Sequence, residues 1–175
     1  ISTPTVKQVI SYKPYGADKL LVVAEEKDTE QANVILIDKP GQVTLANLPK
    51  QPTQDYVLDM AQFDGDWYVV VGSQQDSGVS IYRNSFDLIK QHTSKLPTPI
   101  ARLDLPNPRT LSFSRNAKYI AVTNGQQFVV FNNELERTYR YTLPVALDQT
   151  VTKLPWIDGS HLLLISGGHQ YMIDY

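Results

Sequence analysis

The chain has 175 residues, of which 42% are hydrophobic and 19% are charged, an ordinary composition for a folded globular protein. The formal net charge of −2 argues against a nucleic-acid partner, because binding phosphates needs a clustered excess of Lys and Arg. Cysteine is absent, which excludes disulfides and thiolate metal sites, and no apolar run approaches the roughly 18 to 20 residues that cross a bilayer. We therefore expect no direct membrane insertion by this segment.

Four apolar runs recur along the chain, and a turn sequence precedes each of them. They occupy residues 20–24, 68–72, 119–123 and 162–166. Runs without polar alternation are typical of strands that are buried on both faces. We expect these runs to be the inner strands of successive sheets.

A further strand is expected after each run, at residues 34–37, 79–82, 128–131 and 171–173. The polar residues that close these strands are Asp38, Arg83, Asn132 and Asp174, at intervals of 45, 49 and 42 residues. A period of about 40 to 50 residues is typical of the blades of a β-propeller.

The clearest repeat spans residues 109–143. Two of its strands are separated by Asn124-Gly125, a dipeptide that favours a two-residue hairpin turn. Four antiparallel strands in about 40 residues make one blade. Fourth strands are expected at residues 43–48, 88–96 and 136–143, whereas the final repeat reaches only its third strand by Tyr175.

The sequence thus predicts an all-β, β-propeller-like fold with at most a short turn of helix. A single domain is expected, with blades at about 5–50, 55–105, 108–147 and 150–175, the last of them incomplete. We expect these 175 residues to be part of a larger propeller, and we expect them on their own to form an open structure or to self-associate through the open blade edge. The residues expected in the core are Val22, Ile35, Val70, Ile81, Ile120, Val122, Val129, Leu163 and Ile165.

Residues 111–122 (LSFSRNAKYIAV) resemble the first half of a WD-repeat or TolB-like blade. Asn116 stands where that pattern has glycine, and Phe131-Asn132 or Ile173-Asp174 stands where it has Trp-Asp. The repeats also resemble the propeller region of bacterial envelope proteins that carry a PEGA domain. That second resemblance implies an extracytoplasmic, non-enzymatic binding role.

Candidate catalytic residues gather near the end of the chain, where His161 and His169 flank Ser166-Gly167-Gly168. A serine hydrolase needs its nucleophile on a strained G-x-S-x-G elbow with a partnered histidine and carboxylate. The first glycine is missing here, so a hairpin turn made of Ser, Gly and Gly is the favoured interpretation.

Asp64, Asp66 and Asp76 are candidates for a carboxylate pair or a calcium loop. They lack the alternating ligands of a calcium loop and are interpreted as turn residues. The acidic stretch 25–30 is interpreted as a solvated hairpin tip. Matched aromatic positions favour packing between blades over ligand contact; they are Tyr68, Tyr82, Tyr119 and Phe131. The sequence therefore predicts no catalytic, cofactor or metal site.

Two classes of function remain. The favoured one is a non-catalytic binding or scaffold module for a protein or peptide partner, since rigid blades and variable loops suffice for it. The alternative is a propeller that binds a ligand or gates substrate for an enzyme domain outside these residues.

Overall fold

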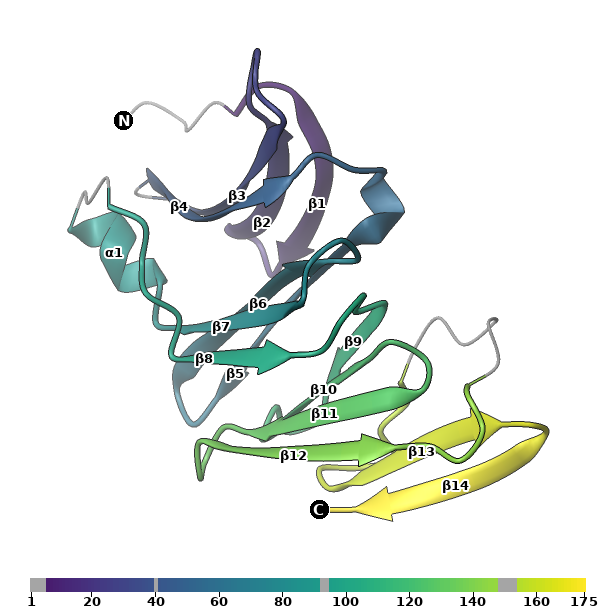
Figure 1. The fold of residues 1–175 in the computed structure, drawn as a ribbon. Helices are drawn as coiled ribbons and strands as arrows, with labels where there is room; N and C mark the ends of the chain where they lie inside the picture. Colours follow the sequence, from purple (N-terminus) through teal and green to yellow (C-terminus); the bar gives the residue numbers. More distant parts are fainter. Residues whose placement is uncertain (1–5, 40, 92–94, 148–153) are drawn as a thin grey trace.

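Four antiparallel sheets follow one another along the chain (Figure 1). The computed structural model describes residues 6–39, 41–91, 95–147 and 154–175. The first sheet contains β1 (Val9–Tyr15), β2 (Lys19–Glu25), β3 (Gln31–Asp38) and β4 (Gly41–Pro49). The second contains β5 (Tyr56–Phe63), β6 (Asp66–Ser73), β7 (Gly78–Arg83) and β8 (Ala101–Asp104).

The third sheet contains β9 (Thr110–Phe113), β10 (Tyr119–Thr123), β11 (Gln127–Asn132) and β12 (Arg137–Thr142). The fourth pairs β13 (His161–Ser166) with β14 (His169–Asp174), and Trp156 adds an isolated bridge to Leu162. Helical structure among the described residues is limited to η1 (Thr53–Asp55) and α1 (Phe86–Lys90). Neither helix is long and apolar enough to cross a membrane.

Each of the first three sheets is a meander, with its strands hydrogen-bonded in chain order. Neighbouring sheets stack face to face, and one hydrophobic cluster fills each of the three interfaces. Stacked four-stranded meanders are the blades of a β-propeller. The chain is thus an all-β partial propeller, as the repeats predict.

The inner strands explain why the apolar runs have no polar alternation. In β6, Val69 and Val71 face the first sheet, whereas Tyr68 and Val70 face the third. In β10, Ile120 and Val122 face the second sheet. Because successive side chains point to opposite faces, a strand between two sheets needs apolar residues at every position.

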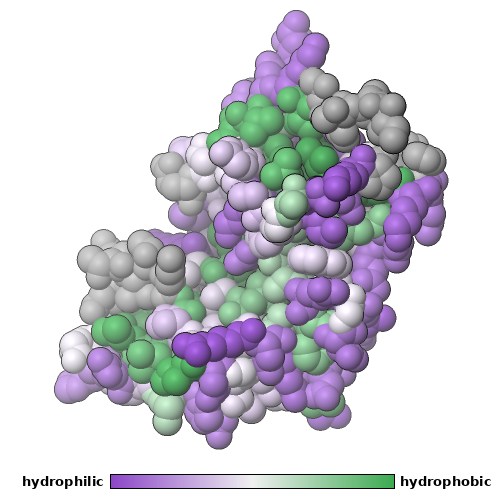
Figure 2. Space-filling model, turned by 180° about the vertical axis from the view of Figure 1, so that it is seen from behind, coloured by the Kyte–Doolittle hydropathy of each residue, from purple (hydrophilic) through white to green (hydrophobic). Residues whose placement is uncertain are grey.

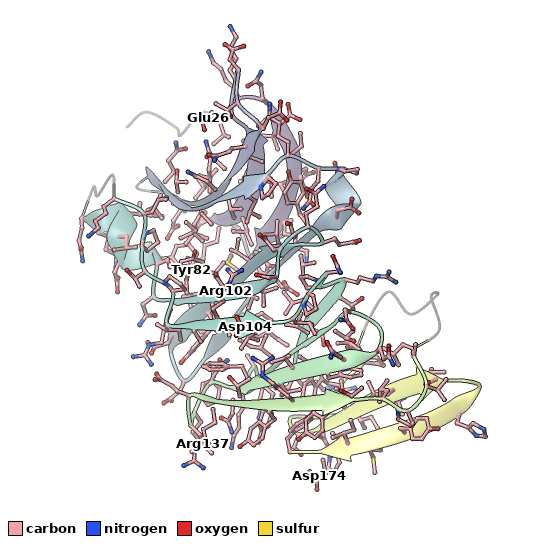
Figure 3. The ribbon with its side chains drawn as sticks, viewed as in Figure 1. Glu26, Tyr82, Arg102, Asp104, Arg137 and Asp174 are labelled. Atoms are coloured by element: carbon pink, nitrogen blue, oxygen red, sulfur yellow. The ribbon has the colours of Figure 1, made fainter. Side chains whose placement is uncertain are left out.

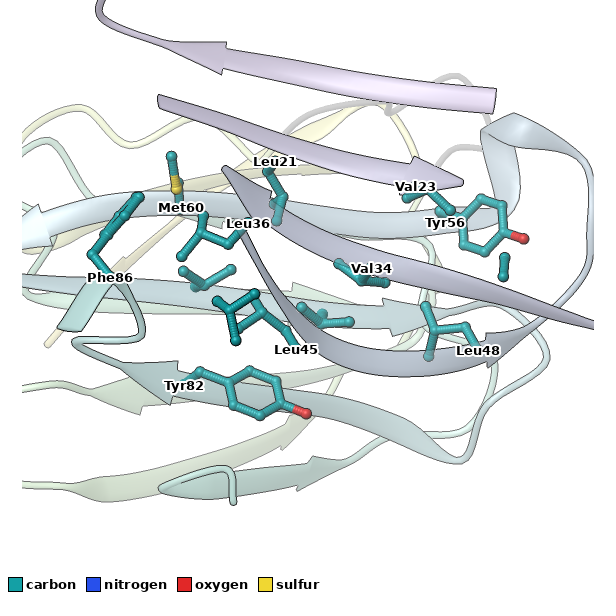
Figure 4. Close-up of a cluster of buried hydrophobic side chains, with 14 of the residues drawn as sticks. Leu21, Val23, Val34, Leu36, Leu45, Leu48, Tyr56, Met60, Tyr82 and Phe86 are labelled. Carbon is teal, nitrogen blue, oxygen red and sulfur yellow. The ribbon is translucent and has the colours of Figure 1, made fainter. Parts of the chain in front are cut away.

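The first interface shows how these side chains meet. Leu21, Leu36 and Leu45 of the first sheet pack with Met60 and Tyr82 of the second (Figure 4). Each fully buried leucine stabilises the fold by about 1.5–3 kcal/mol relative to an exposed one. The interface is therefore a hydrophobic core between two sheets.

The core prediction is confirmed for all but two residues. Val22, Ile35, Val70, Ile81, Ile120, Val122 and Val129 are buried. Leu163 is only partly buried and Ile165 is 39% exposed, so the prediction is wrong for both. Leu162 and Leu164 of the same strand pack on the third sheet, but no described sheet covers the opposite face of β13.

The prediction of a fourth strand at residues 88–96 is also wrong. Residues 86–90 form α1, and the fourth strand of the second sheet is β8. Phe86 and Ile89 have helical spacing and both turn into the core between the first two sheets. Pro97 and Pro99 follow, and proline cannot donate to a strand ladder.

Candidate functional site

A cleft of about 550 Å³ opens between the second and third sheets. Turns from both sheets form its walls, and the β5–β6 and β11–β12 turns lie beside one another at the lower left of Figure 1. We call it the inter-sheet cleft. It is lined by Phe63, Asp64, Asp66, Tyr68, Arg83, Asn116, Asn133 and Glu134.

Asp64 and Gly65 form the two-residue turn between β5 and β6. Their φ angles are 48° and 85°, as the tight Asp-Gly hairpin turn requires. This turn places the Asp64 carboxylate at an exposed tip. Within the described part of the chain, that carboxylate has no hydrogen-bond or ion-pair partner.

Arg83, at the end of β7, forms ion pairs with both walls of the cleft. Its Nε lies 3.5 Å from Oδ2 of Asp66, and its Nη1 lies 3.1 Å from Oε1 of Glu136 in the third sheet. The Tyr68 hydroxyl and then these two carboxylates raise the pKa of Arg83. Oδ1 of Asp66 also accepts a 2.7 Å hydrogen bond from Nδ2 of Asn84. The guanidinium and the Asp66 carboxylate are therefore already engaged.

Asn133 lies in the third-sheet wall and is only 3% exposed. Its Nδ2 donates to the Ala117 carbonyl at 2.7 Å. Its Oδ1 is buried and has no partner among the described residues. Leaving a buried acceptor unpaired costs about 1–3 kcal/mol. The atom is enclosed by the third-sheet wall and is not exposed to the cleft.

The other side chains of this wall have partners. Oδ1 of Asn116 accepts hydrogen bonds from the Ser114 hydroxyl and the Lys118 backbone N–H, at 2.8 and 3.1 Å. Oε2 of Glu134 lies 2.5 Å from Nζ of Lys118 and raises the pKa of that lysine. These contacts hold the wall residues in place.

The cleft is acidic overall, because its lining holds three carboxylates and one guanidinium. Phe63 contributes aromatic surface, and its ring centroid lies 6.5 Å from that of the buried Tyr68 in an edge-to-face arrangement. Among the described residues, no group of three or more His, Asp or Glu side chains is placed to hold a metal ion. The arrangement favours a ligand that brings hydrogen-bond donors and positive charge.

Ser166, Gly167 and Gly168 lie at a hairpin turn, which is the interpretation that the sequence favours. Gly167 and Gly168, with φ of 57° and 77°, make the turn between β13 and β14. The Ser166 hydroxyl donates to the carbonyls of Val145 and Ala146 at 2.9 and 3.0 Å. Ser166 and His169 face each other in the strand register, whereas His161 lies at the opposite end of the hairpin.

His161 instead forms a small surface cluster with two carboxylates. Its Nδ1 lies 2.7 Å from Oδ2 of Asp158, and its Nε2 lies 3.6 Å from Oδ1 of Asp174. The hydrogen bond to Asp158 raises the pKa of His161. The backbone N–H groups of Ser160 and His161, followed by the imidazole, lower the pKa of Asp158.

The other residues considered as functional candidates in the sequence lie away from the cleft or serve mainly in packing. Asp76 accepts a 3.0 Å hydrogen bond from the Ser73 hydroxyl. Glu26 stands at the tip of the β2–β3 hairpin, in the acidic stretch at the far end of the molecule (Figure 3). Packing between sheets accounts for the buried rings of Tyr68, Tyr82, Tyr119 and Phe131.

From the sequence, Asp64 and Asp66 are interpreted as turn residues and Tyr68 as a packing residue, and no role is predicted for Asn133. The available signal was the recurrence of polar turns at one end of successive repeats, at Asp64-Gly65 and Asn132-Asn133. Only the stacking of the sheets brings these turns together.

No family model matches this chain, and no curated protein does. Among solved structures, the chain is similar to the periplasmic gluconolactonase PpgL of Pseudomonas aeruginosa, with 18% identity and a TM-score of 0.50. That match covers 85% of this chain and 47% of the other. Hydrazine synthase of Kuenenia stuttgartiensis matches with 12% identity and a TM-score of 0.50, over 90% of this chain and 56% of the other.

The WD40 domain of Neurospora crassa Pan2 matches with 11% identity and a TM-score of 0.49, over 95% of this chain and 46% of the other. The chain thus spans about half the length of these proteins. At such identities the likeness to the gluconolactonase and to hydrazine synthase concerns the fold alone.

Proposed function

We propose that this chain is a non-catalytic binding module of the β-propeller type and that a protein partner binds at the inter-sheet cleft. The observation that carries the proposal is the cleft itself, which turns from two sheets form and which the Asp64 carboxylate, unpaired among the described residues, borders. Binding residues are often placed on loops that a rigid scaffold holds, and binding sites are often concave.

The walls of the cleft support a preformed site. Ion pairs of Arg83 with Asp66 and Glu136 join the second sheet to the third. An ion pair with Lys118 fixes the position of Glu134. Groups that are held before binding lose little conformational freedom when a partner arrives. The cleft therefore suits binding without rearrangement.

The acidic lining favours a protein partner over a nucleic acid. Asp64, Asp66 and Glu134 would repel phosphate groups, and Arg83 is already paired with carboxylates. An envelope location, implied by the resemblance to PEGA-domain proteins, stays a prediction. A small ligand that excludes the peptide from the cleft would instead favour the substrate-gating alternative.

Selection of peptides from a random phage-displayed library tests this function. We expect enriched peptides that bind the chain and lose affinity for the variant Glu134→Arg, which reverses a charge on the cleft wall. The matched variant Glu26→Arg reverses the same charge at the distant hairpin tip and is expected to bind as the parent does. Equal binding by all three proteins, or no enrichment, would contradict a peptide site in the cleft.

A further inference from the structure

This inference is independent of the inter-sheet cleft and concerns the fourth sheet. We propose that the outer edge of β14 binds an extended segment of a protein partner as an added antiparallel strand, and that apolar side chains of this segment enter a hollow beside the edge. The proposal follows from the backbone groups that the edge exposes and from the apolar surface next to them.

The strand register shows which backbone groups of β14 face outward. The Leu163 N–H donates to the Pro155 carbonyl at 2.9 Å, so Leu163 directs its backbone groups away from β14. Its partner across the antiparallel pair, Met172, must then direct its own groups away from β13. By alternation, Gln170 and Asp174 do the same. Among the described residues, no strand pairs with this side of β14.

β14 also lacks the usual protection of an edge strand. Its sequence, HQYMID, contains no Lys, Arg or Pro, the residues that commonly keep other strands away from an open edge. β12, the outer strand of the third sheet, differs because it carries the exposed Arg137 and Arg140. The edge of β14 is therefore open to a further strand in a way that the edge of β12 is not.

An apolar hollow of about 180 Å³ lies beside this strand. Leu143 and Val145, which follow β12, line one side of it, and Leu164, Tyr171 and Ile173 line the other. Leu164 belongs to the hydrophobic core between the third and fourth sheets, and Ile173 packs against that core. Val145 and Tyr171 remain exposed. The hollow thus continues an existing core to the molecular surface.

The edge and the hollow together define the chemistry of the occupant. The edge offers backbone donors and acceptors in a row, which selects an extended peptide over a small ligand. Successive side chains of a strand point to opposite faces, so the residues opposite Tyr171 and Ile173 enter the hollow and are expected to be apolar. The residue opposite Asp174 faces a carboxylate and is expected to be a cation.

An extended segment of a partner suits this edge better than β14 of a second copy. If two β14 edges paired antiparallel, both third sheets would lie on the same side of the joined sheet and would compete for the space over the hollow. A free segment brings no such sheet. Association of two copies through the opposite face, where Ile165 lies, leaves the edge of β14 accessible.

An NMR titration of the ¹⁵N-labelled chain with the peptide acetyl-Thr-Lys-Val-Thr-Val-Thr-Lys-amide tests the proposal. Its two valines are placed for the hollow, and its central threonine lies opposite Met172. We expect the peptide to shift the backbone amides of residues 170–174 and of Val145 together.

N-methylated peptides distinguish strand addition from apolar adhesion. Methylation of the central threonine removes an N–H that faces β14 and is expected to weaken binding by about tenfold. Methylation of the valine that follows it removes an N–H that points away from β14. This matched control is expected to change binding by less than about twofold.

Variants of the chain provide the corresponding tests on the edge. Met172→Pro removes an outward N–H but keeps the pairing with β13, since proline is tolerated where the N–H of an edge strand faces away. We expect about tenfold weaker binding of the peptide. Met172→Ala also loses the long side chain but keeps the N–H, and it is expected to bind within about twofold of the parent.

Val145→Asp tests the hollow separately, because it places a charge in an apolar wall. It is expected to weaken binding by about tenfold. Val9→Asp makes the same change at an exposed site on the first sheet and is expected to bind as the parent does.

Each contrary result overturns a stated part of the proposal. No shift at millimolar peptide, or equal binding of the two N-methylated peptides, would overturn strand addition. Equal binding by the parent and Val145→Asp would overturn the role of the hollow. Protection of residues 170–174 that rises with chain concentration and excludes the peptide would assign the edge to a second copy instead. Binding at β14 is expected to be unaffected by Glu134→Arg, so the two sites are tested separately.

Discussion

Ile120 and Ile165 occupy comparable positions in two apolar runs, yet the structure places them in different surroundings. Ile120 is fully buried between the second and third sheets, whereas Ile165 is 39% exposed on the outer face of β13. Truncating a buried isoleucine removes its transfer free energy and leaves a cavity.

We expect Ile120→Ala to lower the free energy of unfolding by roughly 2–5 kcal/mol. Ile165→Ala is its matched control and is expected to cost less than about 1 kcal/mol. Urea unfolding followed by fluorescence measures both values. Similar losses for the two variants would show that the outer face of β13 is covered.

The cluster of His161 and Asp158 gives a prediction about pH. Because the pKa of His161 is raised, its contribution to stability is present below its unfolded value of about 6.5 and fades as pH rises through the folded value. Because the pKa of Asp158 is lowered, its contribution is present above about 3.9 and fades as pH falls. The pair therefore stabilises the fold most between these limits.

Melting curves of the parent and of Asp158→Asn, recorded from about pH 3 to 9, should differ most in that window. The NMR titration midpoint of His161 is expected to fall in the variant, since the carboxylate that favours the charged imidazole is gone. An unchanged midpoint would mean that the two side chains are not hydrogen-bonded in solution.

At the scale of elements, the second strand of each sheet could be predicted, because its apolar residues form an unbroken run. The position of the fourth strand of the second sheet could not be predicted. Val79 and Ile81 are followed by a helix whose Phe86 and Ile89 pack into the core between the first two sheets, and the fourth strand, β8, comes only after it. Short apolar segments do not distinguish the two structures, so only the packing decides between them.

Gly78 shows how closely β7 and β8 approach. A Cβ added at this residue would lie 2.3 Å from the Leu103 carbonyl oxygen, which the backbone cannot avoid without moving. We expect Gly78→Ala to cost about 1–3 kcal/mol of stability through overpacking. Ser80→Ala in the same strand is the control and is expected to change stability by less than about 1 kcal/mol.

Chemical denaturation again provides the measurement for Gly78→Ala. Amide exchange in β8 should also accelerate in this variant, because the strand is pushed away from its partner. A variant as stable as the parent would mean that the pairing of β7 with β8 is looser than the structure shows.

At the scale of the whole molecule, the fourth sheet leaves apolar surface uncovered, and such residues gather over it in Figure 2. Ile165 is 39% and Met172 is 64% exposed on this sheet. β13 and β14 pair with each other, and among the described residues no third strand joins their sheet. Exposed apolar surface beside such an open sheet edge favours association with another copy of the chain. Sedimentation velocity should therefore show concentration-dependent association.

Met172→Lys is expected to reduce that association, while Val9→Lys, at a 45% exposed site on the first sheet, is expected to leave it unchanged. A parent chain that sediments as a monomer at all concentrations would contradict self-association through this surface.

The propeller arrangement could be predicted from the repeats, but the inter-sheet cleft could not. Asp64 and Asn133 belong to different repeats, and each looks like an ordinary turn residue in its own surroundings. Their proximity depends on the stacking of two sheets. That Oδ1 of Asn133 has no hydrogen-bond donor among the described residues can be seen only from the three-dimensional structure. Local patterns in the sequence contain neither kind of information.

Hydrogen exchange of the chain with and without a selected peptide tests the binding site most directly. We expect slower exchange in two segments that belong to different sheets, residues 63–68 and 132–136, which form the walls of the cleft. Exchange at the opposite end of the third sheet, in residues 124–127, is expected to stay unchanged. Protection of residues 124–127 alone, or of one wall without the other, would contradict binding at the inter-sheet cleft.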